Sequence, residues 1–321
     1  MAADRADEGA DHVSYDEFGL LHENAAEFGL PNPEPAAVRR EFVEVAPGRR
    51  LSALVWGEAT ATMVFCHGGA QNAHTWDTVA LALGEPLIAV DLPGHGHSDG
   101  PDPGAGALSP EGNARDVAHV IATLAPESDV LVGMSLGGLT AIALDGMRPD
   151  LVRRLVLVDI TPGVTGAKSK AIADFVNGPA TFPSLDDLLA RTIEHNPTRA
   201  VSSLRRGILH NAVQRDDGTW VWRYRRAAGE GLDPPESGTP DFGHLWGVLG
   251  GSTTPVLLVR GMLPQSVVDD DDVAELRRRR PDAQVVEVPN AGHSVQGDTP
   301  IGLATIIRDF VANSEARGDG R

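Results

Sequence analysis

The sequence contains very little cysteine: Cys66 is the only one among 321 residues. A single cysteine excludes an internal disulfide and any zinc site built from several thiolates. Cys66 ends an apolar run that begins at residue 63, so we expect a buried thiol inside a β-strand.

Long apolar runs and positive charge are also scarce. No apolar stretch approaches the roughly 20 residues that a membrane-spanning helix needs. The acidic first residues, MAADRADEGADH, lack the apolar segment of a signal peptide, so we expect a cytoplasmic protein without membrane insertion. Lysine and arginine number 27 against 45 acidic residues, a net charge of −18, which argues against nucleic acid or an anionic membrane as a partner.

The one basic run, at residues 277–280, follows four aspartates at 269–272. Acidic residues at the start of a helix and basic residues at its end complement the helix dipole. We therefore interpret the two runs as one helix rather than as a calcium site or a nucleic-acid patch.

Apolar strands alternating with helical patterns occupy most of the chain, and 41% hydrophobic residues suffice for a large core. The expected elements are a hairpin at 41–46 and 51–56, strands at 61–66, 86–91, 130–132, 154–159, 255–260 and 284–288, and helices at 76–83, 109–124, 136–144, 270–280 and from 300. This alternation predicts an α/β fold with a mostly parallel, doubly wound sheet covered on both faces.

Two segments depart from the alternation. Residues 1–38 are polar and end in a proline-rich stretch, and we expect an N-terminal extension that is partly disordered or packed on the surface. Residues 162–246 show several helical patterns and three tryptophans, but no strand that matches the sheet. We interpret them as a helical cap over the carboxyl ends of the strands, inserted into a core of residues 39–161 and 247–321.

The stretch VLVGMSLGGLT, residues 130–140, changes from a strand to a helix within Gly133-Met134-Ser135-Leu136-Gly137. So tight a turn strains its central residue, and small neighbours relieve the crowding. We expect Ser135 to be exposed at the end of a strand and the start of a helix, as a nucleophile requires. Taken alone, a Gly-x-Ser-x-Gly string is a weak signal, since a glycine-rich crossover would also explain it.

Two further groups are expected at the same edge of the sheet, where ligands bind in such folds. The turn His67-Gly68-Gly69-Ala70 follows a strand, and the N–H groups of Gly69 and Leu136 would stabilise an oxyanion. His293, after the last strand, could act as general base towards Ser135.

These motifs, together with the loop Asp91-Leu92-Pro93-Gly94-His95-Gly96-His97-Ser98, resemble the α/β-hydrolase superfamily over residues 40–315. Relatives that open epoxides or displace halide carry aspartate at the position of Ser135. The resemblance therefore implies a serine hydrolase, a carboxylesterase-like enzyme that cleaves a small-molecule ester or thioester through an acyl-enzyme, with no cofactor and no metal.

The acid that orients His293 has two candidates. In most of the superfamily the acid follows the strand expected at 255–260, but residues 261–268 contain no carboxylate, and Asp269 begins the acidic run that suits a helix start. Another branch places the acid after the preceding strand, where Asp159 lies. We predict Asp159, with a loop-capping role for it and a catalytic Asp269 as the alternatives.

Other conspicuous residues receive structural interpretations. We expect His95 and His97 to turn the chain, His67 to support the oxyanion loop, and His74 to be a loop residue. A substrate pocket lined by Met134, Trp76 and Trp246 is a further hypothesis, with core packing as its competitor.

Three other functions remain compatible with this sequence. A hydrolase of carbon–carbon bonds in β-diketone-like substrates would use the same residues, and so would a cofactor-free haloperoxidase. A receptor for small hydrophobic ligands, with little or no turnover, would belong to a different functional class. The oligomeric state and the identity of the acyl substrate are not predicted.

Overall fold

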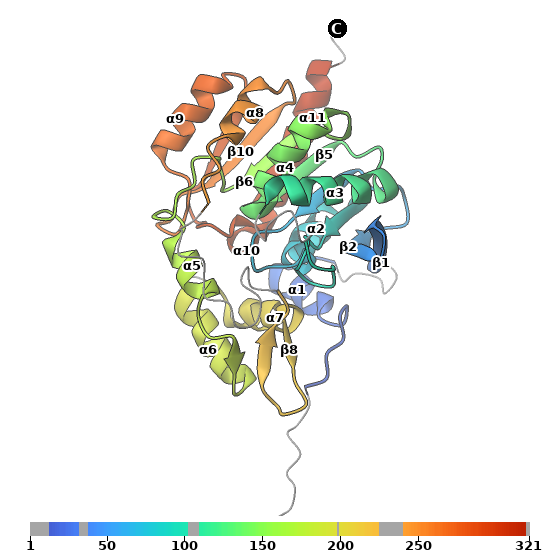
Figure 1. Ribbon diagram of the computed structural model, residues 1–321, viewed down its shortest axis with the longest axis vertical. Helices are drawn as coiled ribbons and strands as arrows, with labels where there is room; N and C mark the ends of the chain where they lie inside the picture. Colours follow the sequence, from blue (N-terminus) through green and yellow to red (C-terminus); the bar gives the residue numbers. More distant parts are fainter. Residues whose placement is uncertain (1–12, 32–37, 102–108, 198, 225–239, 319–321) are drawn as a thin grey trace, which may run out of the picture.

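The computed structural model describes residues 13–31, 38–101, 109–197, 199–224 and 240–318, with side chains as far as residue 313. Residues 1–12 and 32–37 of the predicted N-terminal extension, which include most of the proline-rich stretch, and part of the predicted cap therefore lie outside the described residues. Figure 1 shows a central sheet flanked by helices, with a group of further helices at the lower end of the view.

The main sheet has eight strands in the order β1-β2-β4-β3-β5-β6-β10-β11. Its strands are β1 (Val38–Ala46), β2 (Arg49–Trp56), β3 (Met63–Cys66), β4 (Leu87–Val90), β5 (Val130–Met134), β6 (Leu155–Val158), β10 (Val256–Gly261) and β11 (Gln284–Val288). The β1–β2 and β2–β4 pairs are antiparallel, and all the other pairs are parallel. The predicted doubly wound sheet is confirmed.

Two apolar layers enclose the sheet. One contains residues of α3 (Pro110–Leu124), α4 (Leu136–Met147), α8 (Leu245–Gly251) and α9 (Asp270–Arg279). The other contains residues of α1 (Leu21–Phe28), α2 (Asp77–Leu83), α10 (Val295–Asp298) and α11 (Pro300–Gly318). Cys66 is fully buried in β3, as predicted.

Local sequence signals explain several element ends. Ser109 caps α3 by accepting a hydrogen bond from Gly112 N–H at 3.0 Å, with Pro110 as the first helical residue. Asp269 and Asp272 form a capping box at the start of α9, and arginines occupy its last turn. The acidic and basic runs thus belong to one helix, as predicted.

Between β6 and β10, before α8, the chain forms α5 (Lys170–Val176), α6 (Leu185–His195) and α7 (Val201–Asn211). The helices α5 and α6 lie apart from the helices that flank the sheet, whereas α7 lies beside α1 (Figure 1), and its Arg206 pairs with Glu23 and Glu27. A small antiparallel sheet accompanies them, with the order β7 (Thr181–Phe182), β9 (Trp220–Trp222), β8 (Ala212–Gln214). The sequence analysis predicted helices here and missed this sheet.

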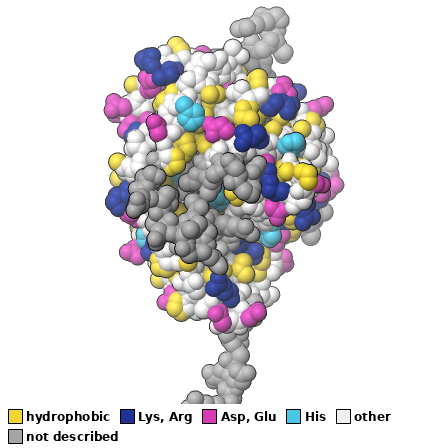
Figure 2. Space-filling model, viewed as in Figure 1, with side chains coloured by type: hydrophobic (Ala, Val, Ile, Leu, Met, Phe, Trp, Pro, Cys, Tyr) yellow, Lys and Arg dark blue, Asp and Glu magenta, His cyan; other side chains and the backbone are white. Residues whose placement is uncertain are grey.

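The described residues show neither a patch of one charge sign on the face seen in Figure 2 nor a membrane-spanning helix. On the face seen in Figure 2, acidic and basic side chains of the described residues alternate rather than separating into patches of one sign. Among the described helices, none is both long enough and apolar enough to span a bilayer.

Candidate active site

Ser135 lies between β5 and α4 in a backbone conformation that side chains rarely adopt, with φ 51° and ψ −119°. The flanking glycines permit this turn because the backbone passes very close to them. A Cβ added to Gly133 would lie 2.4 Å from Gly137 O, and one added to Gly137 would lie 2.3 Å from Cys66 O. The spacing of the motif therefore has a steric cause, and it leaves Ser135 partly exposed at the end of its strand.

The turn after β3 is held by the buried His67. Its Nε2 accepts a hydrogen bond from Leu92 N–H at 2.9 Å, and its Nδ1–H donates to Gly68 O at 2.7 Å. Burial, reinforced by the nearby His95, lowers the pKa of His67 to about 3, so the ring is neutral. Leu92 and Gly68 occupy both ring nitrogens, which leaves His67 a supporting role.

Ala70, in the same turn, has a φ of 61°. His95 and a residue of the segment between β6 and β10 hold it in place. Ala70 N–H donates to His95 Nε2 at 3.1 Å, while His95 Nδ1–H donates to Pro93 O at 3.0 Å. The carbonyl of Ala70 accepts from Asn211 Nδ2, at the end of α7, at 2.7 Å. His95 is thus a buried structural residue, and His97 anchors the same loop through its N–H on Asp91 Oδ2 at 3.0 Å.

The two predicted oxyanion donors belong to turns that adjoin Ser135. Leu136 is the first residue of α4, so its N–H has no acceptor one turn earlier in the helix. For Gly69 N–H, the described residues provide no acceptor. A Cβ on the adjoining Gly68 would lie only 3.2 Å from Ser135 Cβ, which places this turn against the serine.

Asp159 follows β6, is fully buried and has a φ of 48°. Its Oδ1 accepts hydrogen bonds from Gly261 N–H at 2.9 Å and Ser266 Oγ at 2.6 Å. Its Oδ2 accepts from Val267 N–H at 3.1 Å and faces His293 Nδ1 at 2.9 Å. The last residue of β10 and the loop after it, which has no carboxylate up to residue 268, supply the donors that hold the carboxylate of Asp159.

Asp269 has different neighbours. It caps α9, and its carboxylate accepts from Asp272 N–H at 3.0 Å and pairs with Lys168 Nζ at 2.9 Å. The structure brings His293 together with Asp159 and not with Asp269.

His293 lies between β11 and α10 and is 9% exposed. Because Nδ1 binds Asp159, Nε2 is the nitrogen left to face a substrate or the serine. Ser135, Asp159 and His293 follow parallel strands of one sheet, so all three lie at its carboxyl edge. Within the described residues, no hydrogen bond joins Ser135 to His293, and such contacts often tighten only with substrate bound.

Two residues of this site were missed by the sequence analysis. Ser266 donates to Asp159, and Asp298 accepts from Gly292 N–H at 2.9 Å, which fixes the loop that carries His293. Burial raises the pKa of the Asp298 carboxyl. Neither residue belongs to a recognisable motif, so only the three-dimensional arrangement identifies them.

The three residues predicted to line a substrate pocket are buried in the core. Met134 and Trp76 are 1% and 0% exposed, and Trp76 packs on Phe65 with ring centroids 5.0 Å apart. Trp246, on α8, is 8% exposed and lies under the guanidinium of Arg279. Packing accounts for all three, and their contact with substrate stays a prediction.

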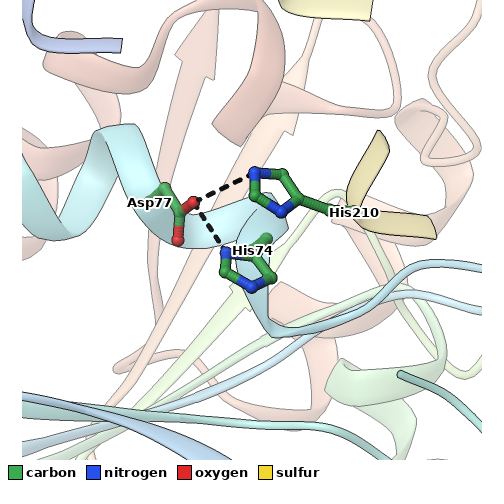
Figure 3. A group of neighbouring side chains, drawn as sticks. All are labelled: His74, Asp77 and His210. Carbon is green, nitrogen blue, oxygen red and sulfur yellow. Dashed lines mark hydrogen bonds and ion pairs between the residues drawn. The ribbon is translucent and has the colours of Figure 1, made fainter. Parts of the chain in front are cut away.

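A group of side chains that could hold a metal ion lies elsewhere: His74, Asp77 and His210 (Figure 3). The expectation that His74 is a simple loop residue is wrong, because it is buried in a 3-10 turn, η1 (Ala73–Trp76), and bound to Asp77.

Comparison with known proteins agrees with this geometry. Residues 63–306 match the alpha/beta hydrolase family. The chain is 44% identical to esterase Rv0045c of Mycobacterium tuberculosis, over 91% of this chain and 95% of that protein. It is 30% identical to the mouse sn-1-specific diacylglycerol lipase ABHD11, over 81% of this chain and 84% of that protein.

A solved structure of the M. tuberculosis esterase, from work on its inhibition by transition metals, covers 94% of this chain and 100% of its own. It superposes with a TM-score of 0.79 at 42% identity. With a strained serine after β5, a buried aspartate–histidine pair at the same sheet edge and these relatives, the chain belongs to the alpha/beta hydrolase family.

Proposed function

We propose that the protein is a serine esterase that cleaves a small-molecule carboxylic ester or thioester through an acyl-enzyme on Ser135. The observation that carries the proposal is the buried His293–Asp159 pair, at 2.9 Å, at the sheet edge where Ser135 lies. The 44% identity to an esterase supports ester hydrolysis as the reaction.

In the acylation step, His293 Nε2 takes the proton of Ser135 Oγ while the oxygen attacks the substrate carbonyl. Asp159 holds the imidazole with Nδ1–H towards its carboxylate and stabilises the imidazolium that forms. The N–H groups of Gly69 and Leu136 donate to the oxyanion. His293 then gives its proton to the leaving alcohol or thiol.

In deacylation, His293 Nε2 takes a proton from water, and the resulting hydroxide oxygen attacks the acyl carbonyl. Collapse of the second tetrahedral intermediate returns the proton to Ser135 Oγ and releases the acid. The same two N–H donors serve both steps, because the oxyanion occupies one position throughout.

We also assign residues 162–246 as the cap of this site. Asn211, the last residue of α7, donates to the carbonyl of Ala70 at 2.7 Å, so the inserted segment directly supports the oxyanion turn. A change in the packing of α7 therefore reaches the catalytic residues through one hydrogen bond.

The test is covalent labelling with a fluorophosphonate, followed by mass spectrometry of the modified peptide, alongside turnover of short-chain p-nitrophenyl esters. We expect one adduct per chain, on Ser135, and loss of ester turnover in proportion to labelling. Labelling at another residue, or full turnover by the labelled protein, would contradict the proposal. Tight binding of hydrophobic esters without turnover would favour the receptor function instead.

A further inference from the structure

Three buried side chains from two distant segments of the chain meet between the core and the inserted segment. His74 lies in η1, Asp77 begins α2, and His210 lies in the last turn of α7. Asp77 Oδ2 is 2.9 Å from His74 Nδ1 and 3.9 Å from His210 Nε2, as the dashed lines in Figure 3 show. One nitrogen of each ring therefore faces a single carboxylate.

The opposite nitrogens are already bound by the N-terminal segment. His74 Nε2 lies 3.1 Å from Glu17 Oε1, and His210 Nδ1 lies 2.8 Å from Tyr15 Oη. Imidazoles that bind metals usually donate their other N–H to a carboxylate or another oxygen, which fixes the ring and its tautomer. Both rings show this arrangement. The other nitrogen of His74 binds Asp77 Oδ2, and that of His210 faces the same oxygen without a hydrogen bond.

Two polar atoms of the cluster lack hydrogen-bond partners. Among the described residues, nothing satisfies His210 Nε2 or Asp77 Oδ1, although the two side chains are 4% and 2% exposed. A buried polar atom without a partner costs roughly 1–3 kcal/mol. The cluster therefore offers both a nitrogen and an oxygen to a ligand of the right size.

A cavity of about 120 Å³ reaches both histidines. Polar side chains dominate its wall, among them Gln71, Asn72, Thr75, Ser203 and Gln296. A small ion could enter here, and water in the cavity could complete its coordination.

We propose that His74, Asp77 and His210 form a binding site for a divalent transition-metal ion, with Zn²⁺ as the best match. Two imidazoles and a carboxylate are ligands that suit Zn²⁺, whereas magnesium and calcium prefer oxygen alone. The three ligand atoms lie within 4.8 Å of one another, so bonds of about 2.0–2.2 Å to one ion require them to move slightly closer together.

Binding requires one rearrangement. The two rings are stacked, with centroids 3.8 Å apart and an angle of 10° between their planes, so their in-plane lone pairs lie in two nearly parallel planes and do not meet at one point. At least one ring must turn for both nitrogens to point at one ion. A bound metal would thus fasten α7 of the inserted segment to η1 and α2 of the core.

The alternative occupant of the same position is a proton. Burial lowers the pKa of His74, but the facing carboxylates of Asp77 and Glu17 outweigh it and raise the pKa to about 9. In the metal-free protein His74 is then an imidazolium paired with Asp77, and a metal ion must displace its proton. The two states differ in what His210 contributes, since only the metal uses its Nε2.

The test measures Zn²⁺ binding to the full chain by equilibrium dialysis, and Co²⁺ binding by its visible absorption. We expect one tight ion per wild-type chain. Loss of an outer partner costs roughly 10–100-fold in metal affinity, so Glu17→Gln should weaken binding by that factor and His210→Gln, which removes a ligand, by more. His244→Gln, at an exposed histidine paired with Glu111, and His293→Gln, at the proposed base, should bind as the wild type does.

Equal affinity in wild type and His210→Gln would overturn the proposal, and so would a loss confined to His293→Gln. Circular dichroism and thermal unfolding show whether each variant is folded. If His210→Gln does not fold, a crystal of the wild-type protein with Zn²⁺ decides the question. An anomalous peak between His74 Nδ1 and His210 Nε2 supports the site, and anomalous peaks only elsewhere refute it.

Discussion

The protein contains two buried histidine–aspartate pairs with the same contact distance. His293 Nδ1 lies 2.9 Å from Asp159 Oδ2, and His74 Nδ1 lies 2.9 Å from Asp77 Oδ2. Both aspartates are at most 2% exposed. By distance and burial alone, the two pairs could not be told apart.

Their surroundings separate them. Asp159 accepts three further hydrogen bonds from the end of β10 and the loop after it, so its carboxylate is fixed and satisfied. Asp77 Oδ1, in contrast, has no partner in the described part of the chain. Glu17 occupies the second nitrogen of His74, while that of His293 is left to face the active site. What surrounds the pair, rather than the pair itself, decides whether the imidazole can move protons for a substrate.

The largest expected effect tests whether the His293 pair serves a nucleophile. Ser135→Ala should lower kcat by about 10⁶, because the imidazole then has no hydroxyl to activate. Initial rates with a p-nitrophenyl ester measure this. Even a tenth of the wild-type rate in the variant would show that Ser135 is not the nucleophile.

The second effect compares the aspartates. Asp159→Asn should lower kcat by about 10⁴, because the amide cannot stabilise the imidazolium and favours the wrong tautomer. Asp77→Asn should leave kcat within a few-fold of wild type if it remains folded. Asp269→Asn, which keeps a capping side chain on α9, is the matched control, and a drop of several orders of magnitude there would assign the acid to the later loop.

A smaller effect is expected from the support of Asp159. Ser266→Ala removes one hydrogen bond to the Asp159 carboxylate, and we expect it to lower kcat by about tenfold. A tenfold loss corresponds to about 1.4 kcal/mol less stabilisation of the transition state. KM should change little, since the hydroxyl binds Asp159 Oδ1 and not the Oδ2 that faces His293. Ser202→Ala, on the exposed face of α7, serves as control. An unchanged kcat for Ser266→Ala would mean that the backbone donors suffice.

The smallest effect concerns the pH dependence of stability at the His74 pair. Burial raises the pKa of Glu17, but hydrogen bonds from His74 and Arg40 outweigh it and lower the pKa to about 2 from 4.5. A carboxyl with a depressed folded-state pKa contributes stability above its unfolded pKa and loses it as the pH falls.

Urea unfolding of wild type and Glu17→Gln measures this contribution. We expect the difference in their free energies of unfolding to be largest above pH 4.5 and to shrink as the pH falls towards 2. Glu41→Gln, at an exposed carboxyl paired with Arg39, should show a smaller and flatter difference. If the difference in free energy of unfolding between wild type and Glu17→Gln does not change with pH, the charge of Glu17 is not what stabilises the fold.

Most of the sheet could be predicted from the sequence because its strands are short apolar runs between helical patterns. The strand predicted at 284–288 coincides with β11, and the hairpin at 41–56 is β1 and β2. The small sheet of the inserted segment could not be predicted, since a strand of two residues such as β7 has no periodicity. The described part of the N-terminal segment forms α1, whose burial of Leu21 and Ala25 depends on partners far along the chain.

The candidate active site could be predicted from local sequence motifs, whereas the cluster of His74, Asp77 and His210 could not. The elbow, the oxyanion turn and the position of His293 have local signatures, and the choice of Asp159 followed from the absence of a carboxylate at 261–268. His74 and Asp77 are one helical turn apart, but their third partner, His210, lies 136 positions after His74. No local pattern indicates that α7 packs at this point, so the cluster could be found only in the folded structure.

The hydrogen bond between Tyr15 and His210 joins residues 195 positions apart. At synthesis rates of about 5–20 residues per second, roughly 10–40 s separate the appearance of the two residues on the ribosome. During that interval the N-terminal segment can pair with Arg40 and His74, but not with α7. The contacts between this segment and α7, which include the ion pair of Glu27 with Arg206, therefore form only after the inserted segment has been translated, whereas Leu21 packs in the core layer that contains residues of α2 and α11.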